Sequence, residues 1–412
     1  MNKKDFWSGL FSGLLIAIFI LCCIICGRII ADAVRDNDSD HLQADSPNNS
    51  WDYDSVLDNP DVINKVEILE ETISKYYIND VDQEDLANGI YDGIMAALDD
   101  PYAAYYTPEE WVELYNSTEG IFYGIGAVLM RNETLLYPQI TRVISGSPAE
   151  QGGLEIDDII YKVDGVDVYD MQLEEVVRMI KGEEGTSVHL EIVRQATGET
   201  FELDLVRQKI ESPTVSISML ENDIAYITIT EFDSVTVDQF AEALADARAY
   251  DMKGLILDLR GNPGGSLTAV VEIAQMLLPE GLVVYTEDKY GNREEYSCDG
   301  KHEIDVPMVV LVNGGSASAA EILAGAIKDY EVGTLVGTTT FGKGIVQRLV
   351  ALEDGSAVKF TVSHYYTPLG NDIHHVGIEP DEVLELDIDA YREDGTDNQL
   401  NRAIEILEQK IN

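Results

Sequence analysis

The chain has 412 residues, of which 45% are apolar, and its 76 acidic residues outnumber 27 lysines and arginines to give a net charge of −49. This length has room for two or three domains and a large buried core. Such negative charge excludes nucleic acid as a partner, and it also excludes adsorption to an anionic lipid surface.

The N-terminus carries a candidate membrane anchor. A lysine pair precedes an uncharged run, Phe6–Cys26, which is long enough to cross about 30 Å of hydrocarbon. Basic residues before the run and acidic residues after it predict that residues 1–30 form a cytoplasmic tip and a single-pass anchor in the cell membrane, with the rest of the chain outside. The alternative is a signal peptide cleaved near Ala31–Ala33, which would release a secreted protein. Residues 31–61 are polar and are expected to form a disordered spacer.

Two helices are predicted after the spacer. Apolar residues recur at helical spacing in Val62–Tyr77 and again in Glu84–Leu98. The second stretch should end at Asp99-Asp100-Pro101, because the residue before a proline disfavours the helical conformation. We therefore expect a helical segment over residues 62–116.

A glycine-containing loop opens the next unit. The loop consists of Tyr123, Gly124, Ile125 and Gly126, directly before a predicted strand. Its backbone N–H groups can hold the terminal carboxylate of a peptide while the strand pairs with the peptide main chain. Segments that resemble a PDZ domain follow in order: Ser147-Pro148-Ala149, Gly153-Leu154, Asp158-Ile159-Ile160, Val163-Asp164-Gly165, and the helical stripe Leu173, Val176, Val177 and Ile180. The resemblance implies a peptide-binding PDZ domain at residues 117–208, and a small β-rich domain without that role is the alternative.

Two residues depart from the PDZ pattern. Gly152 stands where alanine is usual, and Asp157 stands where glycine is usual. Because aspartate tolerates positive φ better than most residues, we expect the turn at Asp157 to persist.

Strands and helices alternate over residues 209–386. Ile224–Ile229 and Leu255–Leu259 are predicted strands, and Val237–Ala249 is a predicted helix. This alternation predicts an α/β core with a mixed sheet, so the whole chain is expected to be a multidomain α+β and α/β protein. Residues 387–412 contain an amphipathic helix that is expected to pack back on the core.

A serine-containing turn stands out within this core. A buried strand, Pro307–Val312, leads through Ser316 and Ser318 into a helical stretch. This position suits a nucleophile, because a helix N-terminus offers unpaired N–H groups to the oxyanion of acyl transfer. The plainer interpretation is an N-cap serine. A nucleophilic serine needs a base, and Lys343 in Phe341–Gly344 is our candidate.

Lysine acts as a base only when it is neutral. Its usual pKa is about 10.4, and burial can lower the pKa by roughly 3 to 5 units. The absence of acidic residues from Leu335 to Leu352 favours the neutral amine. Gly337–Lys343 also has the spacing of a phosphate-binding P-loop. Gly344 occupies the position of the magnesium ligand and a strand is predicted next, so we disfavour a nucleotide site.

These segments resemble the carboxy-terminal processing peptidases, or tail-specific proteases, which are serine peptidases with a Ser-Lys dyad. The resemblance implies that Ser318 is the nucleophile, that Lys343 is the base and that Gln347 helps to hold the lysine. It covers roughly residues 62–381 and includes Gly93–Tyr102, which is similar to the segment before the PDZ domain in the family.

The same resemblance implies an oxyanion hole. The loop Asp258–Gly265 follows a predicted strand, and in the family a glycine N–H of this loop acts together with the N–H after the nucleophile. These donors correspond to Gly264, with Gly265 as an alternative, and to Ala319. Loss of one such donor typically costs on the order of 10² to 10³ in rate.

The predicted function is a membrane-anchored, outward-facing serine endopeptidase. It would recognise the C-terminal tails of protein substrates and cut near them through an acyl-enzyme, without a cofactor. The alternative is an inactive membrane-anchored PDZ scaffold. Relatives with similar N-terminal helices pair into homodimers, which leaves the oligomeric state open here. By analogy, the PDZ domain could hold the active site closed, with Arg178 or Lys181 touching the core.

No metal site is predicted. The only adjacent histidines near the site segments are His374 and His375. In a strand, neighbouring side chains point to opposite faces, so this pair is a poor joint metal ligand.

Overall fold

The computed structural model describes residues 55–411. The predicted anchor and most of the predicted spacer lie outside these residues. In the described part of the chain, no helix is both long enough and apolar enough to span a membrane. The chain divides into two compact units, Met1–Asp82 and Gln83–Asn412.

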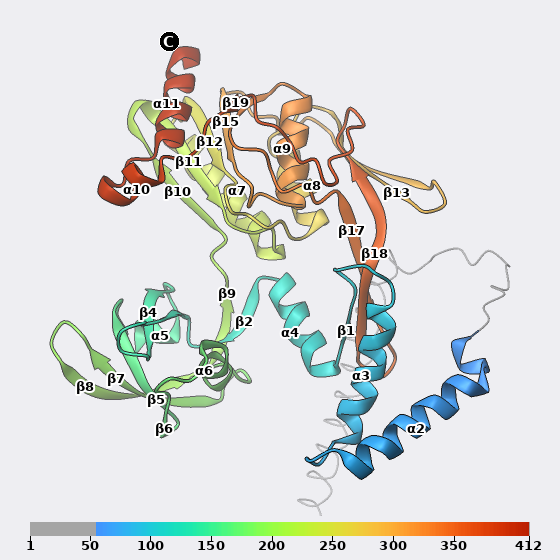
Figure 1. Cartoon of the computed structure of the whole chain (residues 1–412). Coiled ribbons are helices and arrows are strands. Elements are labelled where there is room, and N and C mark those ends of the chain that lie inside the picture. Colours follow the sequence, from blue (N-terminus) through green and yellow to red (C-terminus); the bar gives the residue numbers. More distant parts are fainter. Residues whose placement is uncertain (1–54, 412) are drawn as a thin grey trace, which may run out of the picture. The chain divides into compact units, whose positions relative to one another are not determined.

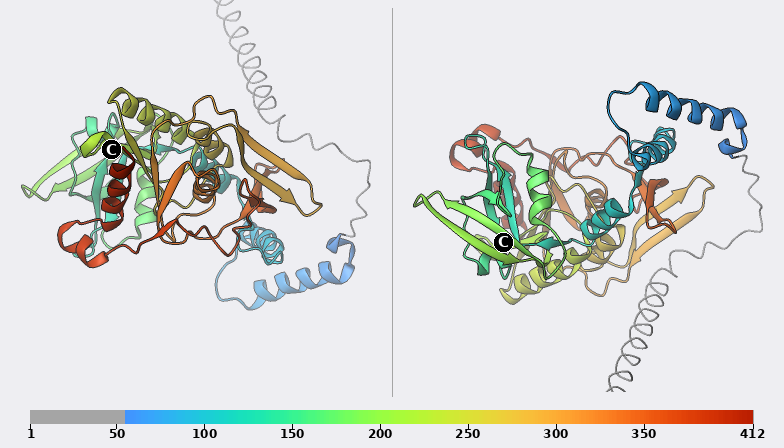
Figure 2. Two further views of the ribbon diagram at one scale, coloured as in Figure 1. Left: turned by 90° about the horizontal axis from the view of Figure 1, so that it is seen from above. Right: turned by 90° about the horizontal axis from the view of Figure 1, so that it is seen from below.

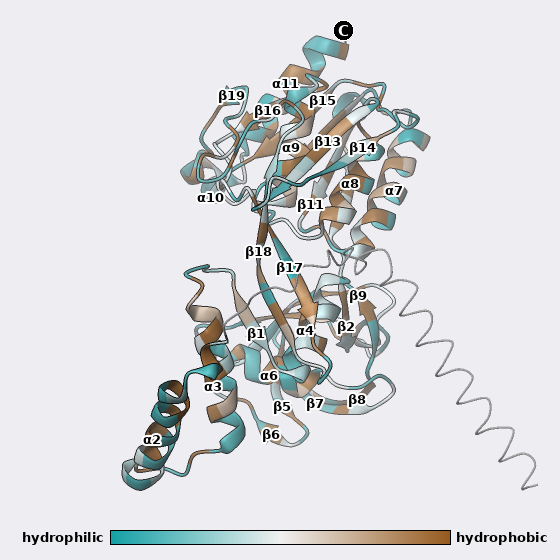
Figure 3. Ribbon diagram, turned by 90° about the vertical axis from the view of Figure 1, so that its right-hand side faces the viewer, coloured by the Kyte–Doolittle hydropathy of each residue, from teal (hydrophilic) through white to brown (hydrophobic). Residues whose placement is uncertain are grey.

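The described part of the first unit is helical. It contains the 3₁₀ helix η1 (Val56–Asp58) and the helix α2 (Pro60–Tyr76), which confirms the helix predicted at Val62–Tyr77. The Asn59 side chain caps α2, and a proline occupies its first position. No residue of α2 is buried, and hydrophobic residues alternate with hydrophilic ones along it (Figure 3).

The second unit begins with α3 (Gln83–Ala96), β1 (Ala104–Tyr106) and α4 (Pro108–Thr118). The helix α3 confirms the helix predicted at Glu84–Leu98. The helix α4 lies almost wholly within the helical segment expected at residues 62–116, but it was not predicted as a separate helix, although a capping-box sequence marks its start. The Thr107 hydroxyl accepts the Glu110 N–H, and the Glu110 carboxylate accepts the Thr107 N–H.

A six-stranded sheet and two short helices form a β-rich domain with its own apolar core. Its elements are β3 (Ala127–Arg131), β4 (Pro138–Val143), α5 (Pro148–Gln151), β5 (Asp158–Val163), β6 (Val166–Asp167), α6 (Leu173–Ile180), β7 (Ser187–Arg194) and β8 (Glu199–Val206). The strands β2 (Ile121–Gly124) and β9 (Gln208–Glu211) pair where the chain enters and leaves this domain.

Both departures from the PDZ pattern have a structural explanation. Asp157 has a φ of 72°, so the expected turn is confirmed with aspartate in the left-handed region. A Cβ at Gly152 would lie 2.6 Å from Leu205 Cδ2, so glycine avoids a clash there.

The peptidase-like core contains a mixed six-stranded sheet in the order β10-β11-β12-β15-β16-β19, in which only β10 runs antiparallel to its neighbour. Its elements are β10 (Val215–Met219), η2 (Glu221–Asp223), β11 (Ile224–Ile229), α7 (Ser234–Ala249), β12 (Gly254–Asp258), α8 (Leu267–Gln275), β15 (Met308–Val312), α9 (Ala319–Asp329), β16 (Gly333–Gly337) and β19 (Glu382–Val383). The predicted strands and helix of this region are confirmed.

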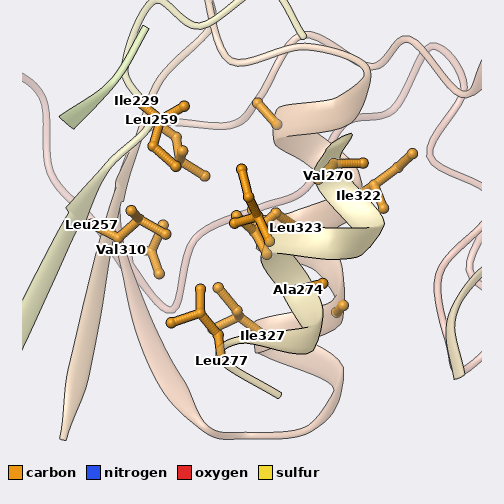
Figure 4. Packing of buried hydrophobic residues seen from close by; sticks show 14 of the residues in the cluster. Ile229, Leu257, Leu259, Val270, Ala274, Leu277, Val310, Ile322, Leu323 and Ile327 are labelled. Carbon is orange, nitrogen blue, oxygen red and sulfur yellow. The ribbon is translucent and has the colours of Figure 1, made fainter. Parts of the chain in front are cut away.

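Helices cover both faces of this sheet (Figure 1). On one face, Leu257 and Val310 pack against Ala274 of α8 and Leu323 of α9 (Figure 4). The opposite face is covered by α11 (Asn398–Ile411), which follows α10 (Ile388–Asp394), as the amphipathic pattern predicted. Because β12 and β15 are parallel neighbours, the loops that follow them emerge side by side.

A second sheet runs in the order β1-β18-β13-β14, with β17 paired to β18. Its later strands are β13 (Gly281–Asp288), β14 (Arg293–Cys298), β17 (Ile345–Ala351) and β18 (Ala357–Tyr366). The β13–β14 hairpin extends away from the core in both views of Figure 2. A strand, and not a helix, follows Lys343, which argues against the P-loop alternative.

Candidate active site

Ser318 lies at the turn between β15 and α9, directly before the first helical residue. Its backbone has a φ of 53° and a ψ of −115°, a conformation that is rare for a residue with a side chain. Strain of this kind typically costs on the order of 1–3 kcal/mol and occurs at nucleophiles held on sharp strand-to-helix turns. The buried Tyr365 hydroxyl donates to the Ser318 carbonyl at 3.0 Å and holds the turn in place.

Ser318 lines a pocket of about 370 Å³. Much of the remaining wall is apolar and comes from three separate elements, with Trp111 on α4, Ile322 on α9 and Leu349 on β17. An apolar pocket beside a strained serine is suited to hold an apolar side chain of a polypeptide.

The loop after β12 lies against the serine. A Cβ at Gly264 would lie 2.6 Å from Ser318 Cβ, so only glycine fits. The Gly264 N–H donates to Asn262 Oδ1 at 2.8 Å and is therefore occupied in this conformation. Gly265 and Ala319 both line the pocket, and among residues 55–411 neither of their N–H groups has an acceptor. The N–H groups of Ala319 and Gly265 are thus free to bind an oxyanion. The Gly264 N–H would first have to break its hydrogen bond to Asn262 Oδ1.

Substitution of Gly264 by alanine is expected to lower kcat/KM on the order of 10² to 10³-fold, because the new Cβ would displace Ser318 from the donors. The matched control is Gly261→Ala in the same loop. Gly261 also has a positive φ, of 71°, but a Cβ there has nothing within 4 Å. The control should lose only about 1 kcal/mol of stability and keep its activity. Equal losses of cleavage rate in the two variants would contradict this assignment.

A buried carboxylate joins the serine turn to the lysine loop. Glu321, in the first turn of α9, is fully buried and accepts hydrogen bonds from the Ser318 N–H at 2.9 Å and the Lys343 N–H at 2.8 Å on one oxygen. Its other oxygen accepts the Gly342 N–H at 2.7 Å and the Thr340 hydroxyl at 2.6 Å. The main chains of the two predicted dyad residues are therefore held side by side.

Glu321 was not among the predicted site residues. The spacing Ser318-Ala319-Ala320-Glu321 matches a capping box, which is the signal that could have identified it. Its presence also shows that a stretch without acidic residues around Lys343 does not exclude a carboxylate from another element.

Lys343 lies in the loop between β16 and β17 and is half-buried. Burial lowers the pKa of its amine below the usual range, the charge of Lys359 acts in the same direction, and Glu321 opposes both. The Nζ atom lies 4.4 Å from the centroid of the Tyr102 ring. Over the described residues, no hydrogen bond joins Nζ to Ser318 Oγ. The fold therefore brings the two loops together without pairing the two reacting atoms.

Gln347 lies on β17 opposite Thr361 of β18, next to a β-bulge, and it lines the same pocket as Ser318. Its Nε2 atom is buried and has no hydrogen-bond partner within residues 55–411. Within the described residues, no hydrogen bond joins Gln347 to Lys343, so the predicted contact is not made in this conformation. A buried donor without a partner costs about 1–3 kcal/mol, and a polar group of a bound substrate would remove that cost.

The neighbouring serine has a different environment. Ser316 is fully buried, and its hydroxyl donates to the Leu259 carbonyl at 2.8 Å and accepts the Asn313 N–H at 3.0 Å. Both interactions are internal, so this hydroxyl supports the loop and does not face the pocket.

The adjacent histidines are arranged differently from our expectation. His374 and His375 lie in a turn and not in a strand, and His375 has a φ of 60°. Their ring centroids are 3.8 Å apart, so the expected opposite orientation is wrong. In the part of the chain that the structure describes, no three His, Cys, Asp or Glu side chains are grouped to hold a metal ion.

The predicted peptide-binding loop, Tyr123–Gly126, joins the end of β2 to β3. Tyr123 lines a second pocket, of about 950 Å³, together with Arg178 and Lys181. Lys181 lies 3.8 Å from the carboxylate of Glu113 on α4. The observed partner of Lys181 is thus the helix before the PDZ-like domain, which differs from the expected contact with the catalytic core.

Comparisons with known proteins find family matches in three parts of the chain. Family models match for peptidase family S41 at residues 223–384, for a PDZ domain at residues 139–194, and for the N-terminal domain of the activating protease CtpB at residues 29–110.

Similar proteins cover most of the chain. A carboxyl-terminal-processing protease of Synechocystis sp. is 38% identical over 320 residues, which are 76% of this chain and 75% of that protein. The carboxy-terminal processing protease CtpA of Bacillus subtilis is 37% identical over 317 residues, or 77% of this chain and 67% of that protein. A solved structure of a photosystem II D1 C-terminal processing protease shares 32% identity, covers 77% of this chain and 86% of its own, and has a TM-score of 0.47.

Proposed function

This chain belongs to the carboxyl-terminal processing proteases of peptidase family S41, which are serine-type endopeptidases, and we propose that it cuts protein substrates near their C-terminal tails with Ser318 as nucleophile and Lys343 as general base. The observation that carries the proposal is the strained backbone of Ser318 at the start of α9, beside the unpaired N–H of Ala319. The lowered pKa of Lys343 supports its role, because a base must be neutral before it takes a proton.

The proposed reaction has two halves. Neutral Lys343 takes the proton of Ser318 Oγ while Oγ bonds to the scissile carbonyl carbon, and the negative charge on the carbonyl oxygen is held by N–H groups of Ala319 and of Gly264 or Gly265. When the C–N bond breaks, the Lys343 ammonium returns its proton to the leaving amine. In the second half, Lys343 takes a proton from water, the hydroxide attacks the ester, and Ser318 recovers its proton as the carboxylic acid product leaves.

In this proposal, the reactive pair forms by a movement of the Lys343 side chain. Because one oxygen of Glu321 already holds the main-chain N–H groups of both residues, we propose that a change in the Lys343 rotamer brings Nζ to Ser318 Oγ. Substrate binding would favour that rotamer if the scissile peptide contacts both loops.

The remaining parts of the proposal concern recognition and location. The PDZ domain supports recognition of substrate tails, with Tyr123–Gly126 binding the terminal carboxylate. The sequence of Phe6–Cys26 supports a single membrane anchor, with the catalytic part outside the cytoplasm. A secreted form after signal-peptide cleavage is the alternative. A homodimer also belongs to the proposal, and it rests on the resemblance alone.

A fluorophosphonate probe, which reacts with activated serine hydroxyls, tests the proposal against the inactive PDZ scaffold. We expect the purified full chain to be labelled, the adduct to map to Ser318 by mass spectrometry, and Ser318→Ala to prevent labelling. Ser316→Ala should keep the label, because the Ser316 hydroxyl is buried and paired. An unlabelled chain would favour the scaffold, whereas an adduct at Ser316 would contradict Ser318 as the nucleophile.

A further inference from the structure

We propose that Tyr102 is a positioning residue for the catalytic lysine, and that the face of its ring stabilises the ammonium that forms when Lys343 takes the serine proton. This inference rests on the proposed Ser318–Lys343 dyad and adds to it a partner for the base. Tyr102 belongs to a turn far from the dyad in the sequence, and no expected site residue lies in that turn.

The contact is direct. Lys343 Nζ lies 4.4 Å from the centroid of the Tyr102 ring, well within the distance at which an aromatic face attracts a cation. Within residues 55–411, Nζ has no hydrogen bond and no ion pair, so the ring is its principal partner there. A half-buried amine without a polar partner gains more from such a face than a fully solvated one does.

The turn that carries Tyr102 is firmly held. One oxygen of Asp100 accepts the Tyr102 N–H at 3.0 Å, and the other accepts the Thr361 N–H of β18 at 2.8 Å. The following strand β1 then pairs with β18, with Ala104 opposite Lys359. Because the ring is placed by this scaffold and not by Lys343 itself, it does not move with the lysine, and the proposal requires Nζ to remain within about 6 Å of the ring centroid when it turns toward Ser318 Oγ.

Other charged and titratable groups around Lys343 do not replace the ring. Glu321 faces it from α9, but four internal donors already occupy the Glu321 oxygens. Lys359 faces it from β18 and repels an ammonium. The main chain of His374 lies against Gly344. Glu321 thus favours the ammonium by its charge but makes no ion pair with Nζ among the described residues, whereas the Tyr102 ring contacts Nζ directly.

The ring acts differently on the two forms of the lysine. A neutral amine gains little from an aromatic face, whereas an ammonium gains electrostatic energy. Above the lysine pKa, only the transition state contains the ammonium, so the ring lowers the barrier. Below that pKa, the resting enzyme also contains the ammonium. The ring then stabilises the resting enzyme and the transition state equally, so it does not change the barrier. The ring therefore raises the lysine pKa and the high-pH rate together.

Loss of the ring should therefore change the pH profile of kcat/KM in a way that a purely structural role of Tyr102 would not. Wild-type kcat/KM for fluorescently labelled casein should rise with pH through the Lys343 pKa and then level off. In Tyr102→Leu, the apparent pKa should fall by about one unit and the plateau by about ten-fold, while the two profiles meet at low pH. Tyr102→Phe keeps the ring and should follow the wild type.

The matched control is Tyr106→Leu. Tyr106 on β1 contacts Lys359, with Nζ 5.3 Å from the ring centroid, so the variant removes a similar contact that does not involve the proposed base. It should leave the plateau unchanged and shift the apparent pKa much less than Tyr102→Leu does, since Lys359 acts on Lys343 only through its charge. An equal loss at every pH in Tyr102→Leu, an upward shift of the pKa, or equal losses in Tyr102→Phe and Tyr102→Leu would each overturn the proposal.

A second measurement avoids dependence on the fold of the leucine variant. Phenylalanines with two and three fluorines, incorporated at position 102, keep the shape of the ring and progressively weaken the negative charge of its face. The apparent pKa and the plateau should fall stepwise with fluorine number, and constant values would refute the cation–π role. Ser318→Ala in the same assay tests the dyad separately. Activity in that variant would overturn the proposed function independently of the results for variants at position 102.

Discussion

Replacement of Ser318 by alanine is expected to lower kcat/KM for labelled casein by about 10⁴-fold or more in the full chain, purified in a mild detergent. Lys343→Ala should have a similar effect, because an unassisted serine hydroxyl is a weak nucleophile at neutral pH. The two losses should not add in the double variant, since the residues act in one proton transfer. Release of fluorescent fragments, measured with and without each substitution, provides the rates.

Two further variants complete this test. Lys343→Arg keeps a positive charge but cannot act as a base near neutral pH, so it should be as inactive as the alanine variant. Ser316→Ala removes the neighbouring hydroxyl, whose bond to the Leu259 carbonyl is structural. It should lose about 1–2 kcal/mol of stability and keep most of its activity. Retained cleavage in Ser318→Ala or Lys343→Ala would refute the dyad.

Glu321→Gln is expected to damage both stability and activity. The carboxylate of Glu321 accepts four hydrogen bonds, including those from the main chains of Ser318 and Lys343. A glutamine amide of the same size turns one oxygen into a donor, which would face other donors inside the protein. We expect the free energy of unfolding to fall by about 2–4 kcal/mol and kcat/KM to fall at least about 100-fold, because small displacements of reacting groups are costly.

The measurements are the thermal midpoint and kcat/KM for the same casein substrate. Glu272→Gln on α8 is the matched control, because this glutamate is exposed on the same domain. This control should change the free energy of unfolding by no more than about 0.5 kcal/mol and kcat/KM by no more than about two-fold. If Glu321→Gln behaved like Glu272→Gln, the buried carboxylate would not be what aligns the two loops.

Prediction from sequence succeeded where neighbouring residues decide the structure. The strand Ile224–Ile229 and the amphipathic C-terminal helix follow from apolar periodicity, and Asp157 follows from the tolerance of aspartate for positive φ. Prediction failed at His374 and His375, because the pattern did not show that the chain turns there before it returns to the core. The helix α4 was expected only as part of the helical segment at residues 62–116, although Thr107 and Glu110 form a capping box that marks it as a separate helix.

The role of Glu321 illustrates a second kind of failure. The residues near Lys343 in the sequence contain no acid, and this absence suggested an apolar environment for the amine. In the folded protein, α9 places a carboxylate against the lysine loop, and its charge opposes the effect of burial on the lysine pKa. A charge pattern along the chain therefore describes the surroundings of a buried side chain poorly, because those surroundings come from several elements.

Motifs in the amino-acid sequence were sufficient to recognise the family and to select Ser318 and Lys343, since these depend on residue types at short spacing. Folding alone decided that Glu321 joins the two loops, that the Gly264 N–H is engaged by Asn262, and that Lys343 rests over a distant tyrosine ring. Those contacts arise from strand register and from the meeting of loops remote in the chain, and no local pattern encodes either.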